Sequence, residues 1–216
     1  IPTTNNEADF CDCNLAVIGM PNVGKSSFVN KILNKNLSIV SNIAGTTRDS
    51  VDSFFKYYNK TIRLVDTAGL RKRSKINEEI EFYSLIRTER SLEQADVAIV
   101  MIDANLGFRK QDRDIVRMVI DQGKGMVIAV NKWDLVNKDT DSMKKYIDQI
   151  VYQFPSIGHY PIIFTSVTSN KRVQTVLSEA IEVYERRNNK VKTNDLNKWL
   201  DRILQINPPP AVKGKY

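Results

Sequence analysis

The chain has 216 residues, 42% of them hydrophobic, and carries 32 Lys and Arg against 25 Asp and Glu, a formal net charge of +7. Such a chain is long and apolar enough to bury a full core, which excludes a disordered protein and suits one α/β domain plus a fragment of another. It has no apolar run near the roughly 20 residues that span a bilayer and no signal-peptide pattern, so we expect a cytoplasmic protein without a membrane partner.

Residues 1–13 are expected to form a linker that precedes the first strand. The linker contains the only two cysteines, Cys11 and Cys13, and the whole chain has one His. Closed zinc sites use four nitrogen or sulfur ligands, so these residues do not suffice for one. We expect both thiols to be reduced, as is usual in the cytosol.

The chain is organised around Gly-Met-Pro-Asn-Val-Gly-Lys-Ser at residues 19–26, which lies between an apolar run and a helix-like segment. A glycine-rich turn followed by a helix N-terminus lets backbone N–H groups surround a phosphate. Lys25 is expected to reach the β and γ phosphates, and the Ser26 hydroxyl to bind Mg²⁺. The alternative is a glycine turn that only joins a strand to a helix. The predicted phosphate-binding residues are Gly19, Pro21, Asn22, Val23, Gly24, Lys25, Ser26 and Ser27.

A polar stretch follows at 34–50, and then two strand-like runs, 51–58 and 61–65, joined by a short hairpin connection. Thr46 and Thr47 lie in the polar stretch. One of them is expected to bind the metal and the γ phosphate, and thereby to tie this loop to the nucleotide. Spacing alone does not separate the two residues, and our prediction for the metal ligand is Thr47.

The second strand-like run leads directly into Asp66-Thr67-Ala68-Gly69. Asp66 is expected to hold Mg²⁺ through water, and the Gly69 N–H to bond the γ phosphate. An Asp at the end of a strand also caps many turns, and this remains the structural alternative.

Strand-like and helix-like segments then alternate. After a helix at 78–94, apolar strands are expected at 97–102, 126–130 and 161–164, and helices at 111–122, 140–154 and 170–187. Buried strands that alternate with helices predict an α/β fold with a mostly parallel sheet and helices on both faces. Ligands of such sheets bind at the carboxyl ends of the strands, where all the motifs lie.

The segment Asn-Lys-Trp-Asp at 131–134 indicates a choice of base. Guanine presents two adjacent donors, N1–H and the N2 amine, which the Asp134 carboxylate accepts together, with Asn131 as the second specificity residue. Adenine would leave Asp134 without partners, which is costly when buried. The Lys132 stem is expected to lie along the base, and a backbone N–H of Ser166 or Val167 to bond the guanine O6. The alternative is a helix-capping turn.

The composition changes past residue 191. An amphipathic helix is expected at 193–206, and prolines at 208–210 end it. Residues 186–216 hold eight basic and two acidic residues, so almost all of the net charge lies there. A basic end on a neutral body indicates contact with a polyanion, and we expect RNA; the alternative is a solvated helix face with a flexible tail.

Residues 19–26, 46–47, 66–69, 131–134 and 166–167 together resemble the motif order of translation-factor-class small GTPases. Segments 21–26, 44–49 and 66–73 resemble the Era-like group, and within it the Der family of ribosome-biogenesis GTPases. The resemblance implies a P-loop NTPase fold. Members carry two tandem GTPase domains and a KH-like domain; residues 14–190 resemble the second GTPase domain, and 191–216 a truncated start of the KH-like domain. Many relatives have Ser-Ala where this chain has Ser166-Val167. The larger Val167 side chain affects only how the edge of the base fits the site, and not the choice of nucleotide.

The resemblance implies an enzyme that binds GTP and GDP, hydrolyses GTP and gates contact with ribosomal RNA during assembly of the large ribosomal subunit. Lys25, Thr47 and Gly69 are expected to act on the transferred phosphate. Leu70 stands where Ras-like GTPases have the Gln that orients water. The sequence also assigns no arginine finger, so charge that develops on the phosphates needs another stabiliser. The resemblance implies K⁺ in this role, held by Asn22; Arg48 or the basic residues at 71–73 are the alternative.

Three other functions are alternatives to this one. A tRNA-modification GTPase shares the phosphate motif but ends in a cysteine-bearing tail, and no cysteine follows Cys13 here. A nucleotide-sensing module would bind RNA or protein, with incidental hydrolysis. A P-loop kinase would leave Asn131 and Asp134 unexplained. We expect the protein to be monomeric.

Overall fold

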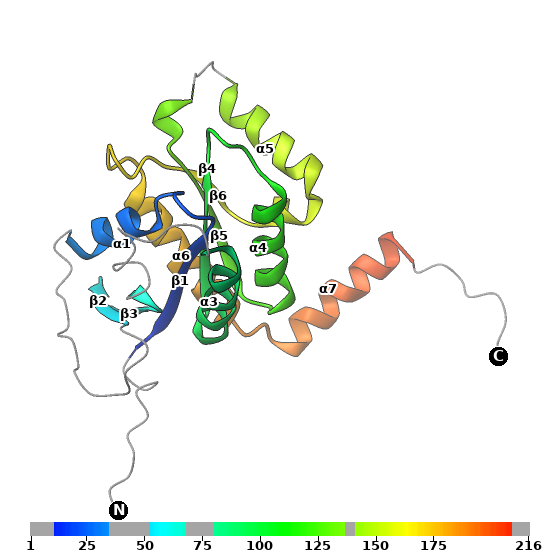
Figure 1. The fold of residues 1–216 in the computed structure, drawn as a ribbon. Helices are drawn as coiled ribbons and strands as arrows, with labels where there is room; N and C mark the ends of the chain where they lie inside the picture. Colours follow the sequence, from blue (N-terminus) through cyan, green and yellow to red (C-terminus); the bar gives the residue numbers. More distant parts are fainter. Residues whose placement is uncertain (1–10, 35–51, 68–79, 137–140, 209–216) are drawn as a thin grey trace, which may run out of the picture. The chain divides into compact units, whose positions relative to one another are not determined.

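The computed structural model describes residues 11–34, 52–67, 80–136 and 141–208. By its internal contacts the chain divides into two compact units, Ile1–Tyr184 and Glu185–Tyr216. The first unit contains one sheet and the helices that cover it (Figure 1). The second contains the helix α7 (Thr193–Ile206).

The sheet has six strands in the order β2-β3-β1-β4-β5-β6. Only β2 runs antiparallel to its neighbour β3, and the other pairs are parallel, which confirms the predicted mostly parallel sheet. The strands are β1 (Cys13–Gly19), β2 (Ser53–Tyr57), β3 (Lys60–Leu64), β4 (Val97–Asp103), β5 (Gly125–Asn131) and β6 (Ile162–Phe164).

Helices cover both faces of the sheet, as predicted (Figure 1). Successive side chains of a strand point to opposite faces. Leu15 and Val17 of β1 accordingly pack in one core with α1 and α6, whereas Ala16 and Ile18 pack in the other with α3, α4 and α5. The helices are α1 (Lys25–Asn34), α3 (Ile80–Gln94), α4 (Lys110–Asp121), α5 (Ser142–Gln153) and α6 (Val173–Asn188). Because both faces are covered, all seven residues of β4 and of β5 are buried.

The helix predicted from residue 170 begins three residues later, at Val173. Asn170 and Arg172 have φ angles of 56° and 57°, which a right-handed helix does not admit. Ser166 and Lys171 instead pair through both backbone N–H groups, at 3.1 and 2.9 Å. Residues 165–172 therefore form a tight loop, hereafter the base loop. Two short 3₁₀ turns, η2 (Trp133–Leu135) and η3 (Pro155–His159), were also not predicted.

In the second unit, α7 (Thr193–Ile206) has the bounds predicted from the sequence. Its large apolar side chains are all exposed: Leu196, Trp199, Leu200, Ile203, Leu204 and Ile206. That this helix opens a KH-like domain stays a prediction. None of the described helices has both the length and the apolar composition needed to cross a bilayer.

Candidate nucleotide site at the carboxyl edge of the sheet

Most of the predicted functional residues lie at one edge of the sheet. Residues 19–27 begin at the last residue of β1, and residues 131–134 begin at the last residue of β5. Asp66 and Thr67 follow β3, and the base loop follows β6. These four strands are parallel, so their carboxyl ends lie at the same edge. Thr46, Thr47, Ala68, Gly69 and Leu70 lie outside the described residues.

The phosphate loop, residues 19–26, needs glycine at two positions. Gly19 has φ 141°, and a Cβ there would lie 2.3 Å from the carbonyl oxygen of Met101 on β4. Gly24 has φ 103°, and a Cβ there would lie 2.3 Å from Asn131 Nδ2. At these two positions the loop passes too close to β4 and β5 for any residue larger than glycine. The loop leads directly into the N-terminus of α1, which begins at Lys25.

The Lys25 ammonium group lies over the phosphate loop. Its Nζ donates to the carbonyl oxygens of Gly19 and Met20, at 2.7 and 2.6 Å. Carbonyls bind an ammonium less strongly than phosphate oxygens do, because the latter carry full charge. A phosphate bound in the loop would therefore compete with these two carbonyls for the Lys25 ammonium group. The side chain already lies over the loop where that phosphate would bind.

Asn131 joins the phosphate loop to the base loop. Its Nδ2 donates to the Val23 carbonyl at 2.8 Å, and its Oδ1 accepts from the Val167 N–H at 3.1 Å. Asn131 is 3% exposed, so these contacts are largely shielded from water. Asn131, predicted as a base-specificity residue, thus also fixes the distance between two loops that follow different strands.

Lys132 is paired with Asp103, the last residue of β4. Lys132 Nζ lies 2.6 Å from Asp103 Oδ2, and the Asp103 side chain is 7% exposed. Asp103 Oδ1 also accepts from the Asn105 N–H at 3.0 Å. The pair fixes the end of the Lys132 stem that was predicted to lie along the base. Asp103 was not among the predicted residues, although its signal was present: a carboxylate that ends an otherwise apolar strand.

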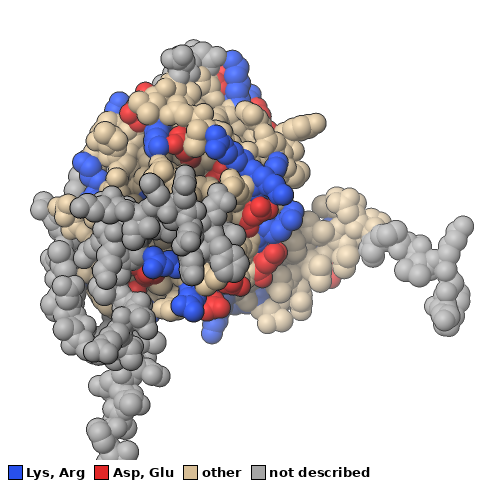
Figure 2. Space-filling model, viewed as in Figure 1, with Lys and Arg blue, Asp and Glu red and all other residues tan. Residues whose placement is uncertain are grey.

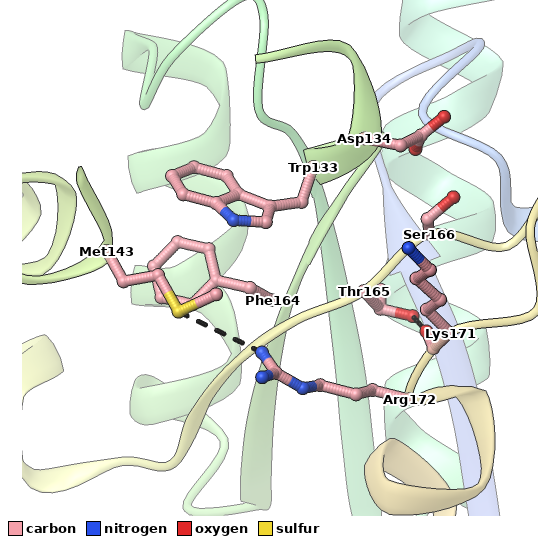
Figure 3. A pocket seen from close by; sticks show the side chains of 8 residues that line it. All are labelled: Trp133, Asp134, Met143, Phe164, Thr165, Ser166, Lys171 and Arg172. Carbon is pink, nitrogen blue, oxygen red and sulfur yellow. Dashed lines mark hydrogen bonds between the residues drawn. The ribbon is translucent and has the colours of Figure 1, made fainter. Parts of the chain in front are cut away.

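Asp134 is exposed, on the 3₁₀ turn η2. The turn is anchored by Trp133, which is buried and packs on Phe164 at a ring-centroid distance of 4.3 Å and on Tyr146 at 5.5 Å. A pocket of about 380 Å³ adjoins Asp134 and Ser166 (Figure 3). Its other lining residues are Trp133, Met143, Phe164, Thr165, Lys171 and Arg172. The aromatic contacts of Trp133 therefore hold the turn that carries Asp134, and Asp134 lies at the edge of this pocket.

The backbone N–H groups predicted to contact O6 already have partners within the protein. The Ser166 N–H bonds the Lys171 carbonyl at 3.1 Å, and the Val167 N–H bonds Asn131 Oδ1. A guanine carbonyl would therefore compete with Asn131 for the Val167 N–H. The contact of these amides with a base stays a prediction.

The predicted metal ligands are oxygen donors of the kind that Mg²⁺ prefers. The Ser26 hydroxyl and the Asp66 carboxylate are hard ligands, and Mg²⁺ is usually bound by one or two such groups together with phosphate oxygens and water. Among the described residues, no group of three or more His, Cys, Asp or Glu side chains could hold a metal by itself. The donor set thus fits a Mg²⁺ ion that arrives with a phosphate ligand.

A profile of the family described as "50S ribosome-binding GTPase" matches residues 14–132. Proteins named GTPase Der from Chlorobium phaeobacteroides and Chlorobaculum parvum are 45% and 46% identical over 99% and 98% of this chain. The matches cover 49% and 48% of those relatives, so the chain spans about half their length.

Among solved structures, Era in complex with MgGDPNP and nucleotides 1506–1542 of 16S ribosomal RNA is similar in fold. The TM-score is 0.58 at 27% identity, over 77% of this chain and 54% of that chain. The sequence relatives carry the name of the family that the motifs resemble, and the structural relative carries the name of its wider group.

Proposed function

Because the chain belongs to the 50S ribosome-binding GTPase family, we propose that the edge of its sheet binds GTP and GDP, and that GTP hydrolysis there switches a step in assembly of the large ribosomal subunit. The observation that carries the proposal is the position of Asn131, which ties Val23 of the phosphate loop to Val167 of the base loop. A site for one nucleotide needs a fixed separation between the segment that binds the phosphates and the segment that binds the base. The two hydrogen bonds of Asn131 would maintain that separation.

At the phosphate end, the backbone of residues 19–26 would surround the β phosphate, with Ser27 in the first turn of α1. Lys25 would turn from the carbonyls of Gly19 and Met20 to the β and γ phosphates. Ser26 and Asp66 would hold Mg²⁺, which supplies charge neutralisation when bound. Thr47, Thr67, Ala68 and Gly69 complete the set expected around the γ phosphate.

At the base end, Asp134 would accept from the N1–H and N2 amine of guanine, while Lys132 lies along the ring. The ion pair of Lys132 with Asp103 supports this role, because it restrains a side chain that otherwise has four rotatable bonds. Adenine offers no pair of donors to Asp134, so ATP is excluded.

Hydrolysis would use K⁺ in place of an arginine finger, with the Asn22 side chain as one ligand. Asn22 is exposed in the phosphate loop and has φ 63°. Its side-chain amide would lie next to a phosphate bound in that loop. A cation at that point would stabilise the charge that develops between the β and γ phosphates. Turnover compared in K⁺ and Na⁺ at equal ionic strength tests this role, and equal rates contradict it.

The proposed macromolecular partner is ribosomal RNA in the cytoplasm. Figure 2 shows basic and acidic side chains intermingled on one face of the protein. The excess of basic residues instead lies in sequence at 186–216, eight against two. RNA affinity of this chain should be modest and should fall steeply with salt. Tight binding that salt does not weaken contradicts this part of the proposal.

Calorimetric titration with GTP, GDP and ATP in K⁺ and Mg²⁺ tests the site as a whole. We expect GTP and GDP to bind and ATP to give no heat of binding; ATP binding as tightly as GDP overturns the proposal. Single-turnover hydrolysis then separates an enzyme from a nucleotide-sensing module, since a rate equal to that in solvent favours the module.

A further inference from the structure

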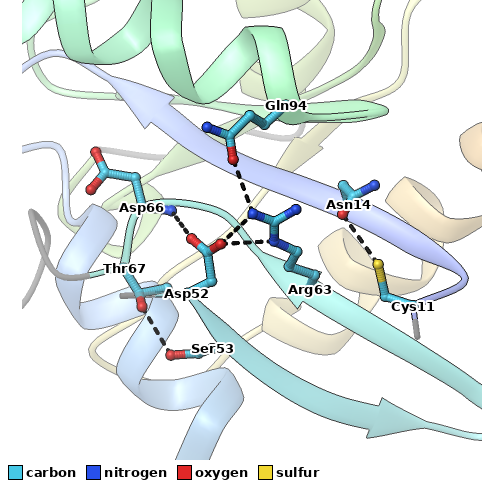
Figure 4. A network of polar contacts seen from close by, with 8 residues as sticks. All are labelled: Cys11, Asn14, Asp52, Ser53, Arg63, Asp66, Thr67 and Gln94. Carbon is cyan, nitrogen blue, oxygen red and sulfur yellow. Dashed lines mark hydrogen bonds and ion pairs between the residues drawn. The ribbon is translucent and has the colours of Figure 1, made fainter. Parts of the chain in front are cut away.

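A carboxylate outside the predicted site, that of Asp52, is tied to the predicted metal ligand Asp66 (Figure 4). Asp52 Oδ1 accepts from the backbone N–H of Asp66 at 2.8 Å. Asp52 Oδ2 accepts from Arg63 Nε at 2.8 Å and from Arg63 Nη2 at 2.5 Å. The Asp52 side chain is only 10% exposed. Both carboxylate oxygens are thus committed within the protein, which leaves Asp52 unsuited to bind a ligand itself.

The bond is made to a residue whose backbone is left-handed. Asp66 has φ 54°, in a region that residues with a side chain seldom adopt, although Asp is among those that adopt it most often. A second tie holds the next residue, because the hydroxyls of Ser53 and Thr67 lie 2.9 Å apart and are buried. Residues 52–53 therefore clamp residues 66–67 at the end of β3. Figure 4 shows the Asp66 carboxylate pointing away from Asp52, while its N–H points toward it.

Arg63 neutralises the charge of Asp52 by pairing with its carboxylate. An unpaired carboxylate next to Asp66 would raise the cost of a second negative charge and would compete for a cation. The guanidinium neutralises Asp52, and Arg63 Nη2 is itself held by Gln94 Oε1 at 3.0 Å. Asp52 thus supplies a strong acceptor for the Asp66 N–H without adding free negative charge to the metal site.

We infer that Asp52 is a positioning residue for Asp66: it holds the Asp66 backbone in the left-handed conformation from which the carboxylate would hold Mg²⁺ through water. This inference rests on the proposed role of Asp66 at the magnesium site. Groups that orient a metal ligand commonly change metal affinity 10–100-fold when they are removed. Asp52 should therefore affect the part of nucleotide binding that depends on Mg²⁺ and leave the rest unchanged.

The test compares Asp52→Ala with a matched control, Asp12→Ala. Asp12 Oδ2 also accepts a hydrogen bond from a backbone N–H, that of Thr61 at 2.6 Å. Thr61 lies at the opposite end of β3 from Asp66. Release of GDP is measured with Mg²⁺ and with EDTA. We expect Mg²⁺ to slow release from the unsubstituted chain and from Asp12→Ala, and this slowing to be about tenfold smaller in Asp52→Ala. Release in EDTA should be the same for all three.

Hydrogen exchange of the Asp66 amide in the nucleotide-free chain gives a second readout, and should become at least tenfold faster in Asp52→Ala only. Asp52→Asn keeps an acceptor for this amide and should restore most of the magnesium effect. Asp52→Ser, whose hydroxyl is too short to bridge, serves in place of Asp52→Ala if that variant does not fold. A full magnesium effect in the variant without the acceptor overturns the inference alone. Absence of any magnesium effect in the unsubstituted chain overturns the proposed metal site, and the inference with it.

Discussion

The side-chain amide of Asn131 donates a hydrogen bond of 2.8 Å to the carbonyl oxygen of Val23, which lies 108 residues earlier in the chain. The same side chain accepts from the Val167 N–H, a further 36 residues along. Three segments that follow three different strands thus meet at one amide. The geometry of the proposed site depends on this amide as well as on the groups that would contact the nucleotide.

Replacing Asn131 with Ala should disturb both loops. The Val23 carbonyl and the Val167 N–H would lose a buried partner, and each such loss costs about 1–3 kcal/mol. We expect the free energy of unfolding to fall by about 3 kcal/mol and the affinity for GDP to fall at least tenfold. Chemical denaturation and calorimetry measure the two effects.

Asn14→Ala is the control for that substitution. Asn14 Nδ2 donates to Asp96 Oδ2 at 3.0 Å, so the control also removes an amide contact between distant segments, but at the opposite end of β1. It should lower stability by about 1 kcal/mol and leave GDP affinity unchanged. Equal losses of GDP affinity in the two variants would show that Asn131 acts only through general stability.

Glycine 24 provides a second test, because two of its properties can be separated. Gly24→Ala introduces both an unfavourable positive φ and a Cβ that lies 2.3 Å from Asn131 Nδ2. Gly123→Ala has a positive φ of 61° but no atom within 4 Å of the added Cβ. Gly123→Ala should therefore cost only about 1 kcal/mol of backbone strain. Gly24→Ala should cost more and should abolish GDP binding, measured by thermal unfolding with and without GDP. Equal unfolding midpoints for the two variants would mean that the loop has room to move away from Asn131.

The sheet and the identity of the family were predictable because each depends on local patterns. Apolar runs of strand length between helix-like segments predicted the parallel sheet. The spacing of Gly19, Gly24 and Lys25 predicted a phosphate loop, and its order with the later motifs resembled a GTPase family, which the profile match confirms. The start of α6 was not predictable in this way. The helical periodicity extends back to residue 170, but pairing of Ser166 with Lys171 and the positive φ values of Asn170 and Arg172 replace its first turn.

The supporting residues of the site were missed for a different reason. Asp103 meets Lys132, and Asp52 meets Arg63 and Asp66, only because the sheet brings their strand ends together. No local spacing encodes such a pair. The one sequence signal for such a residue is a charge at the end of an apolar strand, and Asp103 at the end of β4 shows this signal.

Replacing Asp134 with Asn should change which base is bound. The carboxylate offers two acceptors, which match the N1–H and N2 amine of guanine, whereas Asn offers one donor and one acceptor. Xanthine has an N1–H and a C2 carbonyl, a pattern that Asn complements. We expect Asp134→Asn to lose GDP affinity by at least a hundredfold and to bind xanthosine diphosphate more tightly than GDP, as measured by competition with a fluorescent nucleotide. A variant that still prefers GDP would show that Asp134 does not contact the base.

The two thiols at the start of β1 should differ sharply in reactivity. Burial raises the pKa of both Cys11 and Cys13, but Cys13 is 0% exposed, whereas Cys11 is only half-buried. The thiolate is the reactive form, so a raised pKa means slow reaction at neutral pH. Between pH 7 and 9, below the pKa, the rate for Cys11 should rise about tenfold per pH unit. Cys13 should react only on unfolding.

An aromatic disulfide reagent, applied to the single variants Cys11→Ser and Cys13→Ser, separates the two rates. The Cys11→Ser chain should show no fast thiol, and addition of denaturant should expose one. Because unfolding lowers both pKa values, the folded state loses relative stability as the pH rises above the unfolded thiol value, and is unaffected by these groups below it. The free energy of unfolding should therefore decline above about pH 8.5, less so in Cys13→Ser. Fast labelling of Cys13 in the native chain would mean that β1 opens at this end without global unfolding.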